Sequence, residues 1–234
     1  MGHVRILEMS QIAEKLEFIR HRIASAAERS GRSAGEVKLV AVSKTYPPEV
    51  IREAIQAGQR CYGENRVQDA LPKIGALPPD LEWHLIGHLQ SNKVRKVIGR
   101  FSLFHGVDNS ALALQMNRIA GEFGVTASIL LEVNISGEQS KFGFTPTSLH
   151  ASLEELLPLP HLRVEGLMTM APFSENPDSA RPVFEGLRKL RDALSTATGH
   201  TLKELSMGMS GDFEQGILEG ATIVRIGSAI FGSR

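Results

Sequence analysis

One lysine follows a short apolar segment and could act as a nucleophile. Lys44 stands directly after residues 37–43, and Val40 and Val42 share its face if that segment is a strand. These valines would partly shield the amine from water, and we expect such an amine to attack an aldehyde and form a Schiff base. From Lys44 alone, a solvated lysine at a strand end is the favoured alternative.

A second segment has the residue types of a phosphate site. Residues 206–212 read Ser-Met-Gly-Met-Ser-Gly-Asp and run directly into a helical pattern. Gly208 and Gly211 let the backbone approach a ligand closely, while Ser210 and the free amides of the helix start can donate hydrogen bonds to an anion. Alone, such a glycine cluster is more typical of a plain turn.

A third segment near the C-terminus repeats this chemistry. Residues 224–232 contain Arg225, Gly227 and Ser228 at the end of the last predicted strand. In α/β barrels, phosphate commonly binds to the loops after the seventh and eighth strands, and these are the positions of the two segments. Together they favour an anion site.

A phosphorylated ligand with an aldehyde would use Lys44 and the anion site at once, and pyridoxal 5'-phosphate (PLP) is the common cofactor of this kind. Arg225 can then hydrogen-bond the pyridine nitrogen. Because an arginine does not give up its proton, the ring nitrogen would stay largely unprotonated and the ring would withdraw electrons poorly. The alternative for Arg225 is a salt bridge inside a barrel with Glu132 or Glu165.

The remaining candidates carry weaker signals. Asn65 could contact the cofactor or cap the following helix, which is the commoner use of asparagine. Met170 could lie against a cofactor ring or serve only in packing. His84 and His88 share a face if their segment is a strand, but no Cys, Asp or Glu pattern completes a metal signature, so we expect no metal.

Eight short apolar segments alternate with helical patterns and must position these residues. The predicted strands cover residues 37–43, 60–63, 81–87, 101–107, 127–135, 162–168, 202–207 and 222–226. The predicted helices cover residues 10–30, 47–58, 65–71, 90–98, 110–123, 147–157, 178–197 and 211–219. Several strands lack polar alternation, as parallel strands buried on both faces do. This α/β pattern favours a single (β/α)8 barrel of the TIM type over an open doubly wound sheet.

Residues 10–30 form an extra N-terminal helix outside the strand–helix alternation. Apolar residues recur there at helical spacing, with Ser10 as the predicted N-cap and Gly31 as the stop. We expect residues 1–234 to form one domain, which this amphipathic helix leads.

Composition limits the classes of partner and compartment. The 26 basic and 26 acidic residues balance, so no global field favours nucleic acid or an anionic membrane. A single cysteine, Cys61, cannot form an intrachain disulfide, and the first residues lack the pattern of a secretory signal. No apolar segment reaches membrane-spanning length. We therefore expect a cytoplasmic protein without nucleic-acid or membrane partners.

Seven segments, in order, resemble those of the pyridoxal phosphate homeostasis protein family, whose members bind PLP and are similar to the N-terminal barrel of alanine racemase. They cover residues 41–45, 63–65, 83–93, 140–143, 165–168, 206–210 and 224–232. The resemblance implies that Lys44 bears PLP as a Schiff base and that Asn65 lies beside the cofactor. It further implies that Ser210, Gly227 and Ser228 bind the phosphate and that Arg225 faces the ring nitrogen.

The family resemblance also implies a role in PLP homeostasis or delivery, with effects on amino-acid and keto-acid pools and with apo-forms of PLP-dependent enzymes as candidate recipients. The similar racemases use a tyrosine from a second domain, whereas Tyr46 and Tyr62 both lie early in this chain. Thr169 and Met170 stand where racemases have Thr-His. We therefore expect a non-catalytic carrier without catalytic residues, in which any racemase-like activity is weak.

Two other functions and one alternative assembly stay open. A PLP-dependent racemase or lyase acting on amino acids would need His84 or Lys141 as a titratable partner. A cofactor-free Schiff-base aldolase would use Lys44 on a sugar phosphate and would be colourless. We expect a monomer, and pairing of two copies through an exposed apolar face of residues 12–23 is the alternative.

Overall fold

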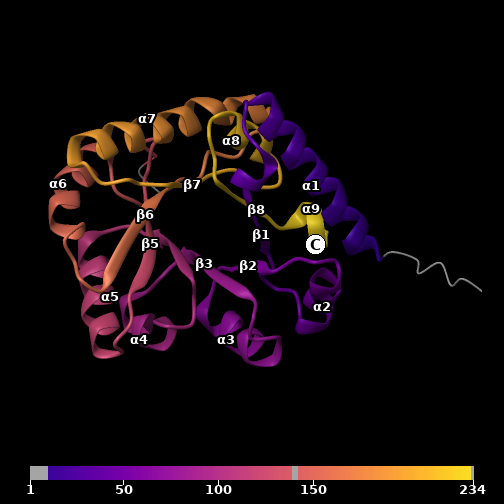
Figure 1. The fold of residues 1–234 in the computed structure, drawn as a ribbon, viewed down its shortest axis with the longest axis horizontal. Helices are drawn as coiled ribbons and strands as arrows, with labels where there is room; N and C mark the ends of the chain where they lie inside the picture. Colours follow the sequence, from indigo (N-terminus) through magenta and orange to yellow (C-terminus); the bar gives the residue numbers. More distant parts are fainter. Residues whose placement is uncertain (1–9, 139–141, 233–234) are drawn as a thin grey trace, which may run out of the picture.

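A closed barrel of parallel strands forms the centre of the computed structural model, which describes residues 10–138 and 142–232 (Figure 1). Its strands are β1 (Lys38–Val42), β2 (Cys61–Glu64), β3 (Glu82–His88), β4 (Leu103–Val107), β5 (Ala127–Glu132), β6 (Leu162–Met168), β7 (Glu204–Ser206) and β8 (Ile223–Ile226). Each strand pairs in parallel with the next, and β8 closes the ring on β1. The predicted (β/α)8 barrel is confirmed.

Helices surround this ring of strands (Figure 1). They are α1 (Gln11–Arg29), α2 (Pro48–Gln56), α3 (Val67–Ala76), α4 (Val94–Val97), α5 (Ser110–Glu122), α6 (Pro146–Leu156), α7 (Arg181–Thr198), α8 (Phe213–Leu218) and α9 (Ser228–Phe231). Three short 3-10 turns are η1 (Ala34–Glu36), η2 (Ser91–Lys93) and η3 (Pro177–Ala180). No helix in the described residues is long and apolar enough to cross a bilayer.

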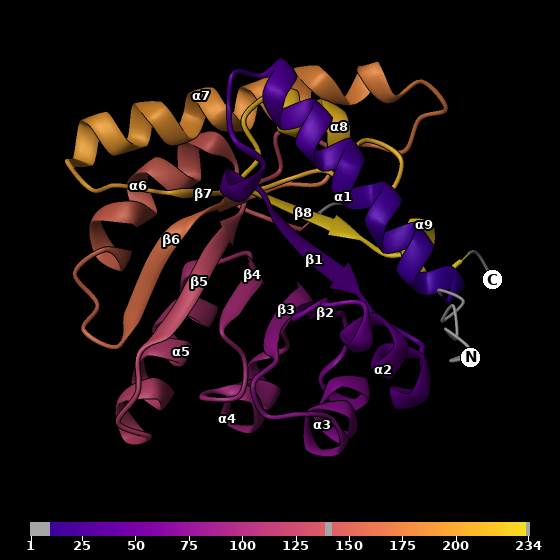
Figure 2. The same cartoon turned by 45° about the vertical axis from the view of Figure 1, so that its right-hand side comes forward.

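The extra N-terminal helix α1 forms as its caps predict. Ser10 Oγ accepts a hydrogen bond from the Ala13 amide (3.3 Å), and Gly31 adopts a φ of 72° just beyond the helix end. The apolar face of α1 is buried against α2, α8 and α9 (Figure 2). The expectation that this face is exposed is therefore wrong, because the chain's own helices cover it; that the protein is a monomer stays a prediction.

Several element boundaries differ from the prediction, and the ends of α3 and β5 are two of them. Helix α3 runs through Pro72 to Ala76 instead of ending at residue 71. Lys73 lies beyond the proline and donates buried hydrogen bonds that anchor this extra turn. Strand β5 ends at Glu132, three residues early, and Val133 forms only an isolated bridge.

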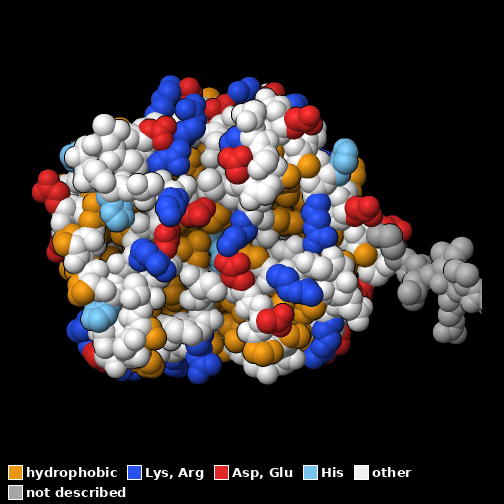
Figure 3. Space-filling model, in the orientation of Figure 1, with side chains coloured by type: hydrophobic (Ala, Val, Ile, Leu, Met, Phe, Trp, Pro, Cys, Tyr) orange, Lys and Arg blue, Asp and Glu red, His pale blue; other side chains and the backbone are white. Residues whose placement is uncertain are grey.

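The barrel interior is partly apolar and partly polar. A small apolar cluster fills one part of it, formed by Val40, Cys61, Leu103, Leu130, Met168 and Ile223. The strands also carry buried polar residues, among them His84 on β3, His105 on β4, Ser206 on β7 and Arg225 on β8. The surface seen down the barrel carries interspersed acidic and basic side chains without a field of one sign (Figure 3).

Candidate functional site

A cavity of about 320 Å³ lies at the carboxyl-terminal mouth of the barrel and brings all the predicted site residues together. Its lining includes Lys44, Asn65, Met170, Ser210, Arg225, Gly227 and Ser228. Val42, Ile86, Met209 and Gly211 complete it. These residues come from the ends of β1, β2, β3, β6, β7 and β8, which are far apart in the sequence but adjacent in the ring.

Lys44 lies on the turn that follows β1. Because the strand ends at Val42, the lysine is exposed at the cavity mouth, and partial shielding of its amine stays a prediction. The next residue, Thr45, has a φ of 73°, a left-handed conformation that is unfavourable for a β-branched side chain. The chain therefore turns sharply just after the lysine.

A buried ion pair beneath Lys44 ties the ends of β1 and β2 together. Lys73 Nζ donates to Glu64 Oε1 (2.7 Å) and to the Ser43 carbonyl (2.8 Å). Ser43 Oγ donates to the same Glu64 oxygen (2.6 Å), and Glu64 is fully buried. The strand ends that carry Lys44 and Asn65 are thus fixed relative to each other. The sequence did not predict this cluster, because Lys73 lies beyond the predicted end of its helix.

The segments after β7 and β8 meet at one point of the cavity. Ser210 Oγ accepts hydrogen bonds from the backbone amides of Gly227 (3.3 Å) and Ala229 (3.4 Å). Gly208 has a φ of 95°, and a Cβ there would lie 2.8 Å from the Phe213 Cα, so the approach requires glycine. Two amides and one hydroxyl therefore converge where an anionic group could bind.

Arg225 is buried at the cavity floor with two fixed partners. Its NH1 donates a short hydrogen bond to Ser206 Oγ, and its NH2 donates to the Thr169 carbonyl (3.0 Å). Burial lowers the pKa of Arg225 to about 10, which still leaves the guanidinium charged at neutral pH. Within the described residues Arg225 forms no salt bridge with Glu132 or Glu165, so that alternative is wrong. The bonds to neutral oxygens take its place.

Ser206 also connects Arg225 to a polar group deeper in the barrel. Ser206 Oγ lies 2.8 Å from His105 Nδ1, and His105 Nε2 lies 2.9 Å from His84 Nδ1. His84 Nε2 lies 2.8 Å from Glu82 Oε1 at the start of β3. His88, which the sequence pattern places on the same strand face as His84, is exposed at the carboxyl-terminal end of β3, and its Nδ1 lies 2.8 Å from Asp108 Oδ2.

Near Glu82 and His84, three side chains have ligand atoms that lie close enough together to bind one metal ion. Ligand atoms of Cys61, Glu82 and His84 all lie within 4.8 Å of one another. The spacing of these three residues in the sequence does not predict the group, because pairing of β2 with β3 in the barrel brings them together. Lys38 Nζ already contacts Glu82 Oε1 at 2.7 Å and would compete with a cation there. That the protein binds no metal stays a prediction.

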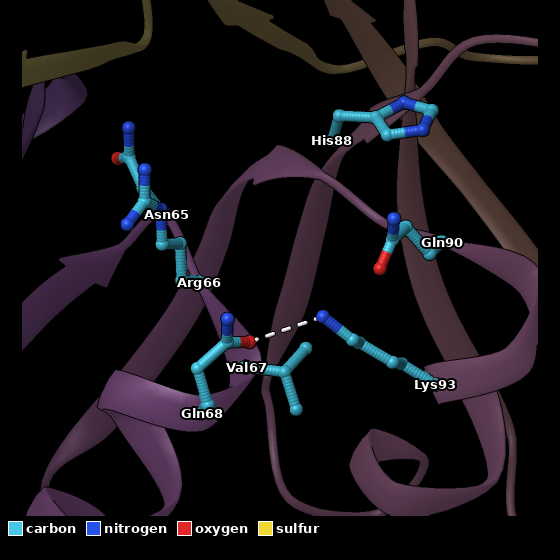
Figure 4. A pocket seen from close by; sticks show the side chains of 7 residues that line it. All are labelled: Asn65, Arg66, Val67, Gln68, His88, Gln90 and Lys93. Atoms are coloured by element: carbon cyan, nitrogen blue, oxygen red, sulfur yellow. Dashed lines mark hydrogen bonds between the residues drawn. The ribbon is translucent and has the colours of Figure 1, made fainter.

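A second pocket of about 250 Å³ adjoins the first and shares Asn65 with it. Lys93 Nζ points across it and donates to Gln68 Oε1 (3.1 Å), while Arg66 and His88 lie on opposite sides (Figure 4). Its lining contains two cations and no carboxylate, so it is suited to an anionic group.

Two further expectations concern residues outside these contacts. Asn65 does not cap α3, because the residue at the N-cap position is Arg66 and it makes no side-chain cap. Lys141, a candidate acid–base group, lies outside the described residues.

Comparisons with known proteins agree with the geometry. The sequence model of the family described as alanine racemase, N-terminal domain, matches residues 15–234. The pyridoxal phosphate homeostasis protein of Aquifex aeolicus is 48% identical over 222 residues, which cover 94% of this chain and 97% of that protein. The protein of the same name from Escherichia coli is 42% identical over 234 residues, which cover 97% of this chain and 98% of that protein.

Solved structures have the same fold. PipY of Synechococcus elongatus, in a structure with PLP bound, is 40% identical and covers 94% of this chain and 100% of its own, with a TM-score of 0.83. Alanine racemase of Clostridium difficile is 16% identical with a TM-score of 0.73, and the match covers 57% of its chain, which shows a shared fold alone.

Proposed function

Because this chain belongs to the pyridoxal phosphate homeostasis protein family and carries an alanine racemase N-terminal domain, we propose that it binds PLP and holds it as a Schiff base on Lys44. One observation carries the proposal. A lysine amine, a cluster of anion donors and a buried guanidinium line a single cavity at the barrel mouth. Bound PLP would supply an aldehyde that a lysine amine can attack.

In this proposal the phosphate of PLP binds where the segment after β7 meets the segment after β8. Ser210, Gly227 and Ser228 offer hydroxyl and backbone donors on one side of the cavity. The Gly211 position has open space, since a Cβ there would meet no heavy atom within 4 Å, so the backbone leaves room for a ligand. The chemistry and the space fit a phosphate group.

The ring nitrogen faces Arg225 in this proposal, with Asn65 and Met170 beside the ring. Arg225 uses one hydrogen of NH1 and one of NH2 within the protein, which leaves Nε–H and one further hydrogen on each terminal nitrogen. A permanent donor keeps the ring nitrogen unprotonated and mutes carbanion chemistry.

The surroundings of the cavity favour a carrier over an enzyme. Tyr46 Oη donates to the Gly232 carbonyl (2.8 Å), and buried Tyr62 Oη donates to the Gln59 carbonyl (3.1 Å). Neither hydroxyl lines the cavity, and Met170 supplies no proton. We infer a non-catalytic role, with weak racemase-like activity as the most that these groups would support.

The same proposal includes the cellular role. The protein would act in PLP homeostasis or delivery in the cytoplasm, as a monomer, with apo-enzymes as recipients and with effects on amino-acid and keto-acid pools. The names of its relatives support the homeostasis role.

The enzyme alternatives have less support. A racemase or lyase would need a titratable group at the cavity, and His84 is not in the lining because it is buried in the barrel interior. A cofactor-free aldolase would use Lys44 without PLP and would stay colourless.

The test is a titration of the full chain with PLP, followed by absorption. We expect a visible band in the wild type, its loss in Lys44→Ala, and its retention in the control Lys93→Ala, which alters the neighbouring pocket. An unchanged band in Lys44→Ala, or no uptake by the wild type, would reject the proposal. Rapid racemisation of alanine or serine by the loaded protein would favour the enzyme alternative.

A further inference from the structure

A line of buried polar side chains crosses the barrel from the cavity floor to the opposite mouth. It runs from Arg225 through Ser206, His105 and His84 to Glu82, with three consecutive contacts of 2.8, 2.9 and 2.8 Å beyond Ser206. The side chains of Ser206, His105 and His84 are fully buried. None of these three lines the cofactor cavity, so direct ligand contact does not explain them.

The two ends of this line fix the direction of its hydrogen bonds. Arg225 can only donate, and an ionised Glu82 can only accept. Hydrogen bonding from His84 and Lys38 lowers the pKa of Glu82 to about 2, so it is a carboxylate at neutral pH. His84 must therefore carry a hydrogen on Nε2, the atom that faces Glu82.

One assignment then satisfies each group in the line. With both rings neutral, Nδ1 of His84 accepts from Nε2–H of His105, and Nδ1 of His105 accepts from the Ser206 hydroxyl, whose oxygen accepts from Arg225. Burial lowers the pKa of His105, which agrees with a neutral ring. With the hydrogen on Nδ1 instead, His105 and Arg225 would both donate to Ser206, whose own hydrogen would lack an acceptor in this line.

We propose that Ser206, His105, His84 and Glu82 are positioning residues for Arg225, joined in a one-way hydrogen-bond line in which both imidazoles are neutral and carry their hydrogen on Nε2. The line fixes NH1 of Arg225 and adds no positive charge beside it, so the remaining guanidinium hydrogens stay directed toward the cavity. The functional part of this inference rests on the proposed binding of PLP.

The first test reads the tautomers without PLP. In 15N-labelled wild type at neutral pH, we expect the rings of His84 and His105 to show the Nε2–H form, whereas exposed His150 and His200 should exchange freely with solvent. A hydrogen on Nδ1 of His105, or an imidazolium at either buried position, would overturn the proposal.

The second test disturbs the far end of the line. Glu82→Gln keeps an oxygen acceptor and should preserve both tautomers, whereas Glu82→Leu removes it and should change the His84 signal. Glu53→Gln, at an exposed glutamate on α2, is the matched control. An unchanged His84 ring in Glu82→Leu would contradict the assignment.

The third test measures the effect at the cavity. His105→Phe breaks the line and should raise the PLP dissociation constant about tenfold, the scale of one charged hydrogen bond, with a shifted absorption band. His105→Gln, which can both donate and accept, should restore most of the affinity. Failure of PLP to bind wild type refutes the proposed function. Binding with unchanged affinity and band in folded His105→Phe refutes the positioning role.

Discussion

Replacement of Lys73 by methionine should destabilise the protein strongly. The Lys73 ammonium contacts Glu64 Oε1 at 2.7 Å, Lys73 is 7% exposed, and Glu64 is fully buried. Glu64 Oε2 has no hydrogen-bond partner among the described residues. Without the ammonium, a buried carboxylate would retain only the hydroxyl of Ser43. Breaking such a pair costs about 3–5 kcal/mol, which for a chain of this size lowers Tm by roughly 6–20 °C.

Thermal and denaturant unfolding of the full chain measure this cost. Lys96→Met, at an exposed lysine, is the matched control and should change the free energy of unfolding by less than about 0.5 kcal/mol. The double variant Lys73→Met/Glu64→Leu should recover most of the loss, because an apolar pair can replace a buried ion pair at little cost. A loss below about 1 kcal/mol in Lys73→Met, or no recovery in the double variant, would refute the reasoning.

Three further predictions concern packing, the anion site and pH. Gly166→Ala would place a Cβ 1.9 Å from a backbone oxygen of β7 and should lower the free energy of unfolding by more than about 4 kcal/mol. The control Gly75→Ala in α3, where a Cβ meets open space, should raise the free energy of unfolding by about 0.5–1 kcal/mol. Ser210→Ala should raise the PLP dissociation constant roughly tenfold or more in a fluorescence titration; an unchanged constant would exclude its phosphate contact. The pKa of Glu82 falls from 4.5 to about 2 on folding, chiefly through the hydrogen bond from His84. The stability advantage of wild type over Glu82→Gln should therefore be complete above about pH 4.5 and disappear as the pH falls toward 2; a constant difference across this range would contradict it.

The barrel and its cavity residues could be predicted because their signals are local. Apolar segments of strand length mark all eight strands, and polar residues at their ends mark the cavity, as Lys44 and Arg225 illustrate. Parallel strands place such ends at one mouth, so no long-range information was needed.

The features that could not be predicted from the sequence depend on contacts between distant segments. Pro72 suggests a helix end, but the buried bonds of Lys73 override that local preference. The line from His84 through His105 to Ser206 joins residues of β3, β4 and β7, and only closure of the barrel sets their contacts. The four-residue helix α9 is too short for a periodic pattern. That residues 1–234 form one domain stays a prediction.

The most direct test of the central claim is peptide mapping of the PLP-loaded protein after borohydride reduction. Reduction converts a Schiff base into a stable secondary amine, so mass spectrometry of the digested chain identifies the lysine that held the cofactor. We predict a single phosphopyridoxyl modification on Lys44, and none at that position in Lys44→Ala. A modification on another lysine such as Lys93, or none in a protein that has taken up PLP, would contradict the account.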